Sequence, residues 1–451
     1  MNSDKKVISG ATIVNEGLLA VGDVFLIGDI IEKVVFYNDT VTPNYTGYKI
    51  VKAVGLHLFP GIIDDQVHFR DPGLTYKGDI YTESKAAVAG GITSFMDMPN
   101  TIPNCLTQEL LEDKYKHAAP ISLANYSFYM GASNNNIDEI VKTNPKNICG
   151  IKVFMGSSTG NMLVDDEDSL SAIFSSAPTL VAVHCEDEDT VVRNNNFYFE
   201  KYGENAPTSI HPKIRSEEAC YLSSAKAVRL AKKHGTRLHV LHLTTAKEMS
   251  LFNNELALAE KKITAEVCVH HLWFSDKDYN RKGNFIKWNP AIKTASDKDA
   301  LLEAVLSNKI DVIATDHAPH TLEEKERSYF KAPAGGPMVQ HSLVAMLEFY
   351  HKGKFTLEKI AEKMCHNPAI LFSVNKRGFI KKGFKADLVL INLNDNWEVK
   401  KDNVLYKCGW SPMEGETFSS KVISTFVNGN CVYDNGIFNE KIKGERLTFN
   451  K

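Results

Sequence analysis

Residues 60–73 read PGIIDDQVHFRDPG, an apolar run that ends in a dense group of polar and charged side chains. The run begins with the β-branched and apolar residues that are typical of a buried strand. The polar group that follows contains Asp64, Asp65, Gln66, His68, Arg70 and Asp71. Ionisable side chains are rarely buried unless they are paired or bind something. We therefore interpret this stretch as a strand that carries functional side chains to its carboxyl end.

Composition indicates a globular protein of more than one structural unit. The chain has 451 residues, and its 52 Lys+Arg and 55 Asp+Glu give a formal net charge of -3. So small a charge attracts neither nucleic acid nor an anionic membrane, and we find no apolar run of signal-peptide or membrane-span length. The eight cysteines form no CxxC pair, which predicts buried free thiols in a reducing compartment. We expect a cytoplasmic protein that acts on a small molecule or binds another protein.

Short apolar strands alternate with helical stretches through the middle of the chain, which is the pattern of repeated βα units. Eight such units predict an α/β fold, a closed (β/α)8 TIM barrel. Helices at Glu217–His234 and Ala246–Lys262 are expected in its outer ring. The eight predicted strands are Gly61–Phe69, Thr93–Met98, Ser122–Met130, Asn147–Met155, Thr179–His184, Arg237–Leu243, Ile263–Phe274 and Asp311–Asp316.

Both flanks of the barrel region have the pattern of β structure. Residues 6–56 and the tail from about Gly378 contain apolar runs broken by turn residues, and Asn428-Gly429 is a strong hairpin signal. The two flanks could share one sheet. We predict a small β-sandwich domain built from residues 1–56 and 376–451, with the barrel at residues 57–375.

The active site of a (β/α)8 barrel lies at the carboxyl ends of its strands, so the polar residues that end each strand are the candidates. Several histidines and a carboxylate that converge on one barrel mouth match the ligands of Zn²⁺. His239 precedes His242 by three residues, and we expect it to pack against the ligands rather than bind the metal. The strand-end residues are His68, Arg70, Asn100, Lys152, His184, His242, His270, Asp316 and His320.

Three of these residues have a simpler interpretation beside the functional one. Lys152 lies in an apolar strand, where an ammonium must find a counter-charge, lose its proton, be modified or extend its amine to the barrel mouth. Asp316 either acts on the metal and its water or caps a helix. Arg70, with Asn100 and His320, either binds a substrate carboxylate or forms a surface ion pair with Asp71.

Nine segments together resemble the cyclic amidohydrolases, and most closely the dihydroorotase branch with a barrel and a β-sandwich. The resemblance covers nearly the whole chain. The segments are PGIIDDQVHFRDPG, MDMPN, GIKVFM, VAVHCE, LHVLHLTT, KWNPAIK, IATDHAPHTLEEK, HNPAILF and SPMEGETFSSKVISTFVNGNCVYDNG.

The resemblance implies a binuclear zinc centre and a role for each matching residue. His68 and Asp316 would bind one metal and His184 and His242 the other, with a carboxylated Lys152 between them. Arg70, Asn100 and His320 would bind the substrate carboxylate, and Asn289 would lie against the ring. The implied reaction is the reversible interconversion of N-carbamoyl-L-aspartate and L-dihydroorotate in pyrimidine synthesis, with Asp316 as the general acid/base. A homo-oligomer, dimer or tetramer, is the implied assembly.

Gln66 departs from the family motif, which has the form Asp-x-His-x-His with histidine at this place. A glutamine carbonyl is a weak, neutral ligand for zinc, so the metal of His68 and Asp316 is expected to bind less tightly. One or two zinc ions per chain are therefore expected.

Two alternatives remain open at this point. Relatives on the same fold open hydantoin or allantoin rings, although His320 with Arg70 and Asn100 favours a substrate that carries a carboxylate. A non-catalytic paralogue that serves as a structural partner is the other alternative, but such chains usually lose several ligands together. The segments 156–178 and 321–336 are long for barrel connections and are expected either to close over the substrate or to lie on the surface.

Overall fold

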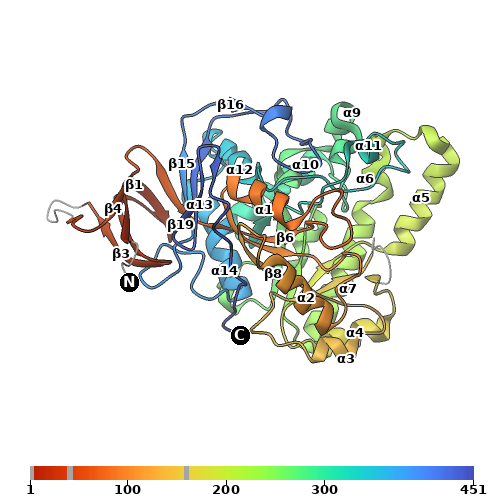
Figure 1. Cartoon of the computed structure of the whole chain (residues 1–451). Helices are drawn as coiled ribbons and strands as arrows, with labels where there is room; N and C mark the ends of the chain where they lie inside the picture. Colours follow the sequence, from red (N-terminus) through yellow and green to blue (C-terminus); the bar gives the residue numbers. More distant parts are fainter. Residues whose placement is uncertain (1–4, 38–43, 157–161) are drawn as a thin grey trace.

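The structure, a computed structural model, describes residues 5–37, 44–156 and 162–451. It shows a barrel with a β-rich unit attached at one end, where strands from both flanks of the sequence lie side by side (Figure 1). No helix in these described ranges is both long and apolar enough to cross a membrane. All eight cysteines are free thiols and six of them are buried, as predicted.

The barrel strands follow one another in sequence order and are parallel. Two hydrogen-bonded groups run β6–β7–β8 and β9–β10–β11–β12–β13–β14. β8 and β9 are consecutive halves of the predicted third strand, and a parallel bridge between Val67 of β6 and His317, just after β14, closes the ring. The predicted eight-stranded barrel is therefore confirmed. Its strands are β6 Ile62–Val67, β7 Ile92–Asp97, β8 Asn125–Phe128, β9 Met130–Gly131, β10 Ile151–Phe154, β11 Val181–His184, β12 Leu238–Val240, β13 Ile263–Cys268 and β14 Val312–Ala314.

Helices surround the barrel and follow most of its strands (Figure 1). α7 is the predicted helix: Ser216 caps its start, and Gly235 ends it in the left-handed conformation that suits glycine. The helices are α1 Ile80–Ala89, α2 Gln108–Ala118, α3 Ile137–Val141, α4 Glu167–Ser176, α5 Glu188–Tyr202, α6 His211–Ile214, α7 Glu217–His234, α8 Val269–Trp273, α9 Tyr279–Lys282, α10 Ala295–Leu306, α11 Leu322–Lys325, α12 Ser342–His351, α13 Leu357–Ala361 and α14 Asn367–Phe372.

Two local predictions were wrong. Residues 246–262 form only two short 3-10 turns, Lys247–Leu251 and Leu258–Glu260. Between them the Asn253 side chain accepts from the backbone N–H of Glu255, a local bond that competes with helix formation, and Asn254 donates to the Ser307 carbonyl of a distant segment. The strand predicted to run to Phe274 ends at Cys268, and the apolar residues beyond it form α8. An apolar run does not by itself distinguish a strand from a buried helix.

The outer unit is one nine-stranded sheet, which confirms that the two flanks share a sheet. β5 pairs with β1 on one side and with β15 on the other, and thereby joins the flanks. β5 lies past residue 56, so the sheet extends beyond the predicted N-terminal segment; the division of the chain into domains stays a prediction. The sheet contains β1 Lys5–Asn15, β2 Leu18–Ile27, β3 Ile30–Phe36, β4 Lys49–Lys52, β5 His57–Pro60, β15 Leu388–Asn392, β18 Lys421–Val427, β19 Asn430–Asp434 and β20 Ile437–Phe438.

The sheet has its own apolar core and a hairpin where the sequence predicts one. Ile13, Leu26, Leu58 and Phe426 are among the buried side chains of this core. Asn428 and Gly429 both have positive φ and connect β18 to β19, as an Asn-Gly turn does. A two-stranded ribbon, β16 Trp397–Glu398 with β17 Thr417–Phe418, lies beside the sheet.

Candidate active site

One pocket at the barrel mouth brings together every residue to which the family resemblance assigns a role. Its cavity of about 280 Å³ opens where the carboxyl ends of the strands meet. The predicted residues in its lining are Gln66, His68, Arg70, Asn100, Lys152, His184, His242, Asn289, Asp316 and His320. These residues span about 250 positions of the sequence. They line one pocket because the parallel strands of the barrel all have their carboxyl ends at the same rim.

His68 and Asp316 form one pair of potential ligands. His68 Nε2 lies 3.1 Å from Asp316 Oδ1, and His68 Nδ1 lies 2.7 Å from Asn100 Oδ1. An amide oxygen only accepts, so the Asn100 contact places a proton on His68 Nδ1 and turns Nε2 toward Asp316, where a metal ion bound with Asp316 would take the lone pair of Nε2. Asn100 therefore orients His68, and only its NH₂ group is left for a substrate.

His184 and His242 form the second pair, with His184 Nδ1 3.0 Å from His242 Nε2. Glu186 accepts from His184 Nε2 at 3.0 Å and pairs with Arg215. Burial raises the pKa of Glu186, but Arg215 and His184 outweigh it and bring the pKa to about 2. An ionised Glu186 therefore holds the proton of His184 on Nε2 and leaves Nδ1 free as a ligand. Sequence reasoning did not single out Glu186, although it ends the quoted segment VAVHCE.

Lys152 reaches the pocket from β10 and is 1% exposed. Burial lowers its pKa to about 7, although Asp316 and Glu266 act in the opposite direction. Its Nζ lies 4.5 Å from the centre of the Phe154 ring. Lys152 is thus a buried amine inside the barrel mouth, not a lysine that extends to the surface.

We expect Lys152→Met to stabilise the metal-free protein. Because the pKa of Lys152 is lower in the folded than in the unfolded chain, the penalty of burying it is full below about pH 7 and disappears as the pH rises toward the ordinary lysine value. The variant should gain ~1–3 kcal/mol in free energy of unfolding at pH 7 and nothing near pH 10. Urea unfolding of both chelator-treated proteins at the two pH values measures this difference. A variant less stable than the native chain at pH 7 would contradict it.

Arg70 faces the pocket and does not pair with Asp71. Its Nε donates to the Pro319 carbonyl at 3.1 Å, and its Nη2 lies 3.0 Å from His320 Nε2. Asp71 is held elsewhere, by His117 at 3.0 Å and by the backbone at the start of α1. The alternative interpretation of Arg70, a surface ion pair with Asp71, is therefore wrong.

Three residues at the mouth have the left-handed backbone conformation that side chains other than glycine seldom adopt. The φ angles are 68° for Arg70, 40° for His242 and 46° for Asp316. Such strain costs on the order of 1–3 kcal/mol per residue and is concentrated at functional sites. Here it turns each side chain into the pocket at the point where its strand ends.

Histidines 270 and 239 lie outside the pocket. His270 was predicted at a strand end, but it lies on α8 and stacks on Trp288, with ring centres 4.1 Å apart. His239 is fully buried beneath the mouth, 3.2 Å from Asp65 and 3.6 Å from Glu266, and Glu266 accepts from the backbone N–H of His242 at 2.8 Å. His239 thus supports a ligand, as predicted, and does not face the pocket.

The two long connections contribute differently. Residues 321–336 begin with α11 and supply Pro333, Ala334 and Gly335 to the pocket wall. In the segment 156–178, residues 157–161 lie outside the described residues, and α4 occupies 167–176, so this connection is not a long loop throughout. Whether either segment closes over a substrate stays a prediction.

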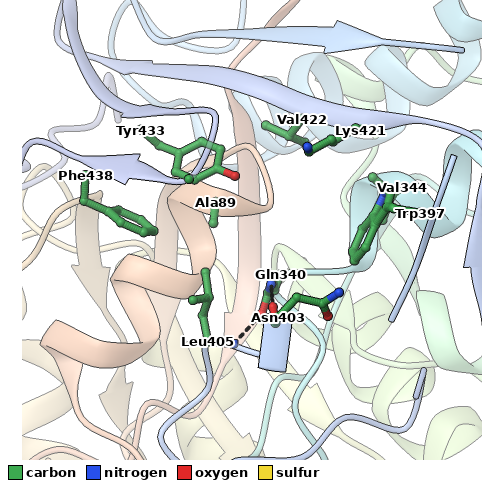
Figure 2. Close-up of a pocket in the computed structure, with 11 residues that line it drawn as sticks. Ala89, Gln340, Val344, Trp397, Asn403, Leu405, Lys421, Val422, Tyr433 and Phe438 are labelled. Carbon is green, nitrogen blue, oxygen red and sulfur yellow. Dashed lines mark hydrogen bonds between the residues drawn. The ribbon is translucent and has the colours of Figure 1, made fainter. Parts of the chain in front are cut away.

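A second pocket, of about 330 Å³, lies away from the barrel mouth between α1, α12 and the C-terminal strands. Figure 2 shows Tyr433 and Phe438 on one side of it and Trp397 on the other, with the hydrogen bond from the Leu405 amide to Gln340 between them. Lys421 and Tyr433 are the ionisable groups among its described lining residues. It therefore offers no set of metal ligands.

A barrel mouth with four histidines, a carboxylate and a buried lysine is typical of metal-dependent amide hydrolases, which act on small molecules. The chain belongs to the Amidohydrolase family, whose profile matches residues 57–432.

Named relatives agree with this family. The chain is 33% identical to a dihydroorotase of Pyrococcus furiosus over 89% of this chain and 87% of the relative. It is 31% identical to a dihydroorotase of Methanothermobacter thermautotrophicus over 85% of each. Among solved structures, an L-hydantoinase (dihydropyrimidinase) from Arthrobacter aurescens has a TM-score of 0.88 at 24% identity over 96% of both chains, a likeness of fold.

Proposed function

We propose that this protein is a dihydroorotase, which interconverts L-dihydroorotate and N-carbamoyl-L-aspartate. The observation that carries the proposal is the buried Arg70 guanidinium in the same pocket as the histidines, Asp316 and Lys152. A substrate whose ring amide lies at the metal ligands would place its carboxylate near Arg70, a cation that forms no ion pair with any described carboxylate. The dihydroorotases of Pyrococcus furiosus and Methanothermobacter thermautotrophicus support the same substrate.

The residues present fit one or two zinc ions. His68 and Asp316 would hold one ion and His184 and His242 the other, since the facing atoms of each pair, His68 Nε2 with Asp316 Oδ1 and His184 Nδ1 with His242 Nε2, lie within about 3 Å of each other. The ions would supply an activated water at neutral pH and polarise the amide carbonyl. At a pKa of about 7 the Lys152 amine is partly unprotonated, and addition to CO₂ with loss of a proton would give an anionic carbamate between the two pairs.

Substrate binding is assigned to the remaining polar residues of the wall. Arg70 Nη2 and the Asn100 NH₂ group would donate to the carboxylate, with His320 beside them. Asn289 Oδ1 is buried and has no hydrogen-bond partner among the described residues, so it is available to accept a ring N–H. Together these groups fix which edge of the ring faces the metal ligands.

Asp316 is assigned the proton transfer. Gln66 Nε2 holds its Oδ1 at 3.1 Å, which leaves Oδ2 for the reaction. In the hydrolytic direction Oδ2 takes a proton from the attacking water and gives it to the ring nitrogen as the amide C–N bond breaks. In the cyclising direction the same oxygen takes the proton from that nitrogen and returns it to the departing water.

Two alternatives to dihydroorotase activity are less well supported by the pocket. A hydantoinase-type or allantoinase-type ring carries no carboxylate to occupy Arg70, so the pocket wall favours dihydroorotate over both. A non-catalytic partner has no need of the oriented lone pairs that Asn100 and Glu186 impose on His68 and His184. On the family resemblance we also propose a cytoplasmic homo-oligomer, a dimer or tetramer.

The deciding experiment is hydrolysis of L-dihydroorotate by the purified protein reconstituted with Zn²⁺, with hydantoin and allantoin as competing substrates. We expect dihydroorotate to have the highest kcat/KM by at least tenfold. No turnover with zinc or any other divalent metal would reject the enzyme, and faster hydantoin or allantoin hydrolysis would reject the substrate.

A further inference from the structure

Lys77 follows the first barrel strand in a loop that the sequence did not single out, and it contacts the active-site wall from behind. It is 8% exposed. Its Nζ lies 2.9 Å from His320 Nδ1 and 2.9 Å from Glu324 Oε1. Lys77 is absent from the lining of the active-site pocket and lines a neighbouring cavity of about 730 Å³, which shares Arg70, Asn100 and His320 with that pocket.

The contact with Lys77 determines where His320 carries its proton. An ammonium group can only donate, so Nδ1 of His320 must accept. The ring proton then lies on Nε2, where the Ala334 carbonyl, 2.9 Å away, accepts it. Lys77 and the Ala334 carbonyl therefore agree on this tautomer, and the Glu324 carboxylate, whose Oε2 lies 3.6 Å from Nδ1, is too distant to accept a proton from that nitrogen as a hydrogen bond.

This tautomer in turn determines what Arg70 can do. Arg70 Nη2 lies 3.0 Å from His320 Nε2, but a protonated Nε2 offers no lone pair to a guanidinium. The Nη2 protons of Arg70 therefore stay available to a ligand in the pocket. In the opposite tautomer Nε2 would accept from Arg70 and occupy the donor that a carboxylate needs.

We propose that Lys77 is a positioning residue for carboxylate recognition: it holds His320 with its proton on Nε2 and thereby keeps the Arg70 guanidinium available to the substrate. The inference rests on the proposed function for the identity of the carboxylate. It adds a residue that does not touch the substrate and acts through His320 and Arg70.

A purely structural role for Lys77 makes a different prediction. Lys77 and Glu324 also form an ion pair between the loop after β6 and the start of α11. If this ion pair were what matters, removing either partner would have the same effect. If the tautomer of His320 matters, Glu324→Gln leaves the Lys77–His320 contact in place and does not weaken anion binding.

The test is calorimetric titration of the zinc-loaded protein with orotate, a pyrimidine that carries the carboxylate. Lys77→Met is expected to weaken orotate binding roughly tenfold, the order of magnitude for one hydrogen bond to a charged group. Lys77→Arg, which also only donates, should restore most of the affinity, and Glu324→Gln should stay within twofold of the native protein. Lys261→Met, which removes a buried lysine paired with Asp311 far from the pocket, is the matched control and should bind as the native protein does.

Two further measurements separate positioning from stability. Lys77→Met should raise the KM for dihydroorotate about tenfold and leave kcat within threefold, because the metal ligands and Asp316 are untouched. In an Arg70→Met background, Lys77→Met should cost nothing more, since it acts through Arg70.

Several results would overturn the inference: unchanged orotate affinity in Lys77→Met, equal losses in Lys77→Met and Glu324→Gln, an additive loss in the double variant, or no orotate binding by the native protein. A native protein that binds orotate as expected but hydrolyses no dihydroorotate would overturn only the proposed function.

Discussion

Asp316→Asn is expected to lower kcat for dihydroorotate by roughly 10³-fold or more and to leave the fold intact. An amide of the same shape neither takes a proton from water nor returns one to the ring nitrogen, and general acid/base groups typically contribute about 10²–10⁴-fold. The hydrogen bond from the Trp288 indole N–H to the Asp316 backbone carbonyl does not involve the substituted side chain, so the strand end keeps its place. Steady-state hydrolysis measures the loss, and thermal melting measures the fold.

The control for this variant is Asp71→Asn. Asp71 is as buried as Asp316 and lies near the same mouth, but it contacts His117 and the start of α1 instead of the pocket. It should keep kcat within a few-fold of the native value. Native rates in Asp316→Asn would refute its role in proton transfer, and a loss of bound metal in that variant would assign part of the effect to ligation.

Gln66→His is expected to strengthen the weaker metal site by about tenfold or more. In the structure the Gln66 amide nitrogen donates to Asp316 Oδ1 at 3.1 Å, and its oxygen faces the Cys268 thiol at 3.9 Å. Gln66 thus occupies the Asp316 oxygen that a metal ion would need, and its own amide oxygen is a weak ligand for zinc. An imidazole at this position would add a ligand that zinc prefers to an amide oxygen.

Metal analysis after dialysis against a mild chelator measures this change. The native protein should retain about one zinc per chain, at His184 and His242, and Gln66→His should approach two. Gln66→Met is the matched control, since it keeps the length of the side chain and removes both polar atoms; it should retain as much zinc as the native protein. Two firmly held ions in the native chain, or a loss of zinc in Gln66→Met, would show that Gln66 is an effective ligand.

The sequence predicted the barrel and the site through one geometric rule. Apolar runs of strand length can be recognised locally, and parallel strands that close a barrel must all end at one rim. The polar residue at the end of each run therefore has a predictable place, which is why Lys152, His184 and Asp316 were found although they are far apart in the chain. His270 was misplaced because the run that contains it changes from strand to helix at Cys268 without a polar residue to mark the change.

What each of these side chains does was decided by tertiary contacts. Asn100 orients His68 from the next strand, and Glu186 orients His184 with the help of Arg215. Lys77 and His320 are separated by 243 positions, and no local pattern links them. Strand position is a property of a short window, so the sequence by itself determined which residues reach the pocket. The position of a proton on a histidine ring, and whether an N–H group is available to a ligand, depend on neighbours that folding brings together. Only the tertiary structure therefore decided which atoms of Arg70, His320 and Gln66 can bind a ligand.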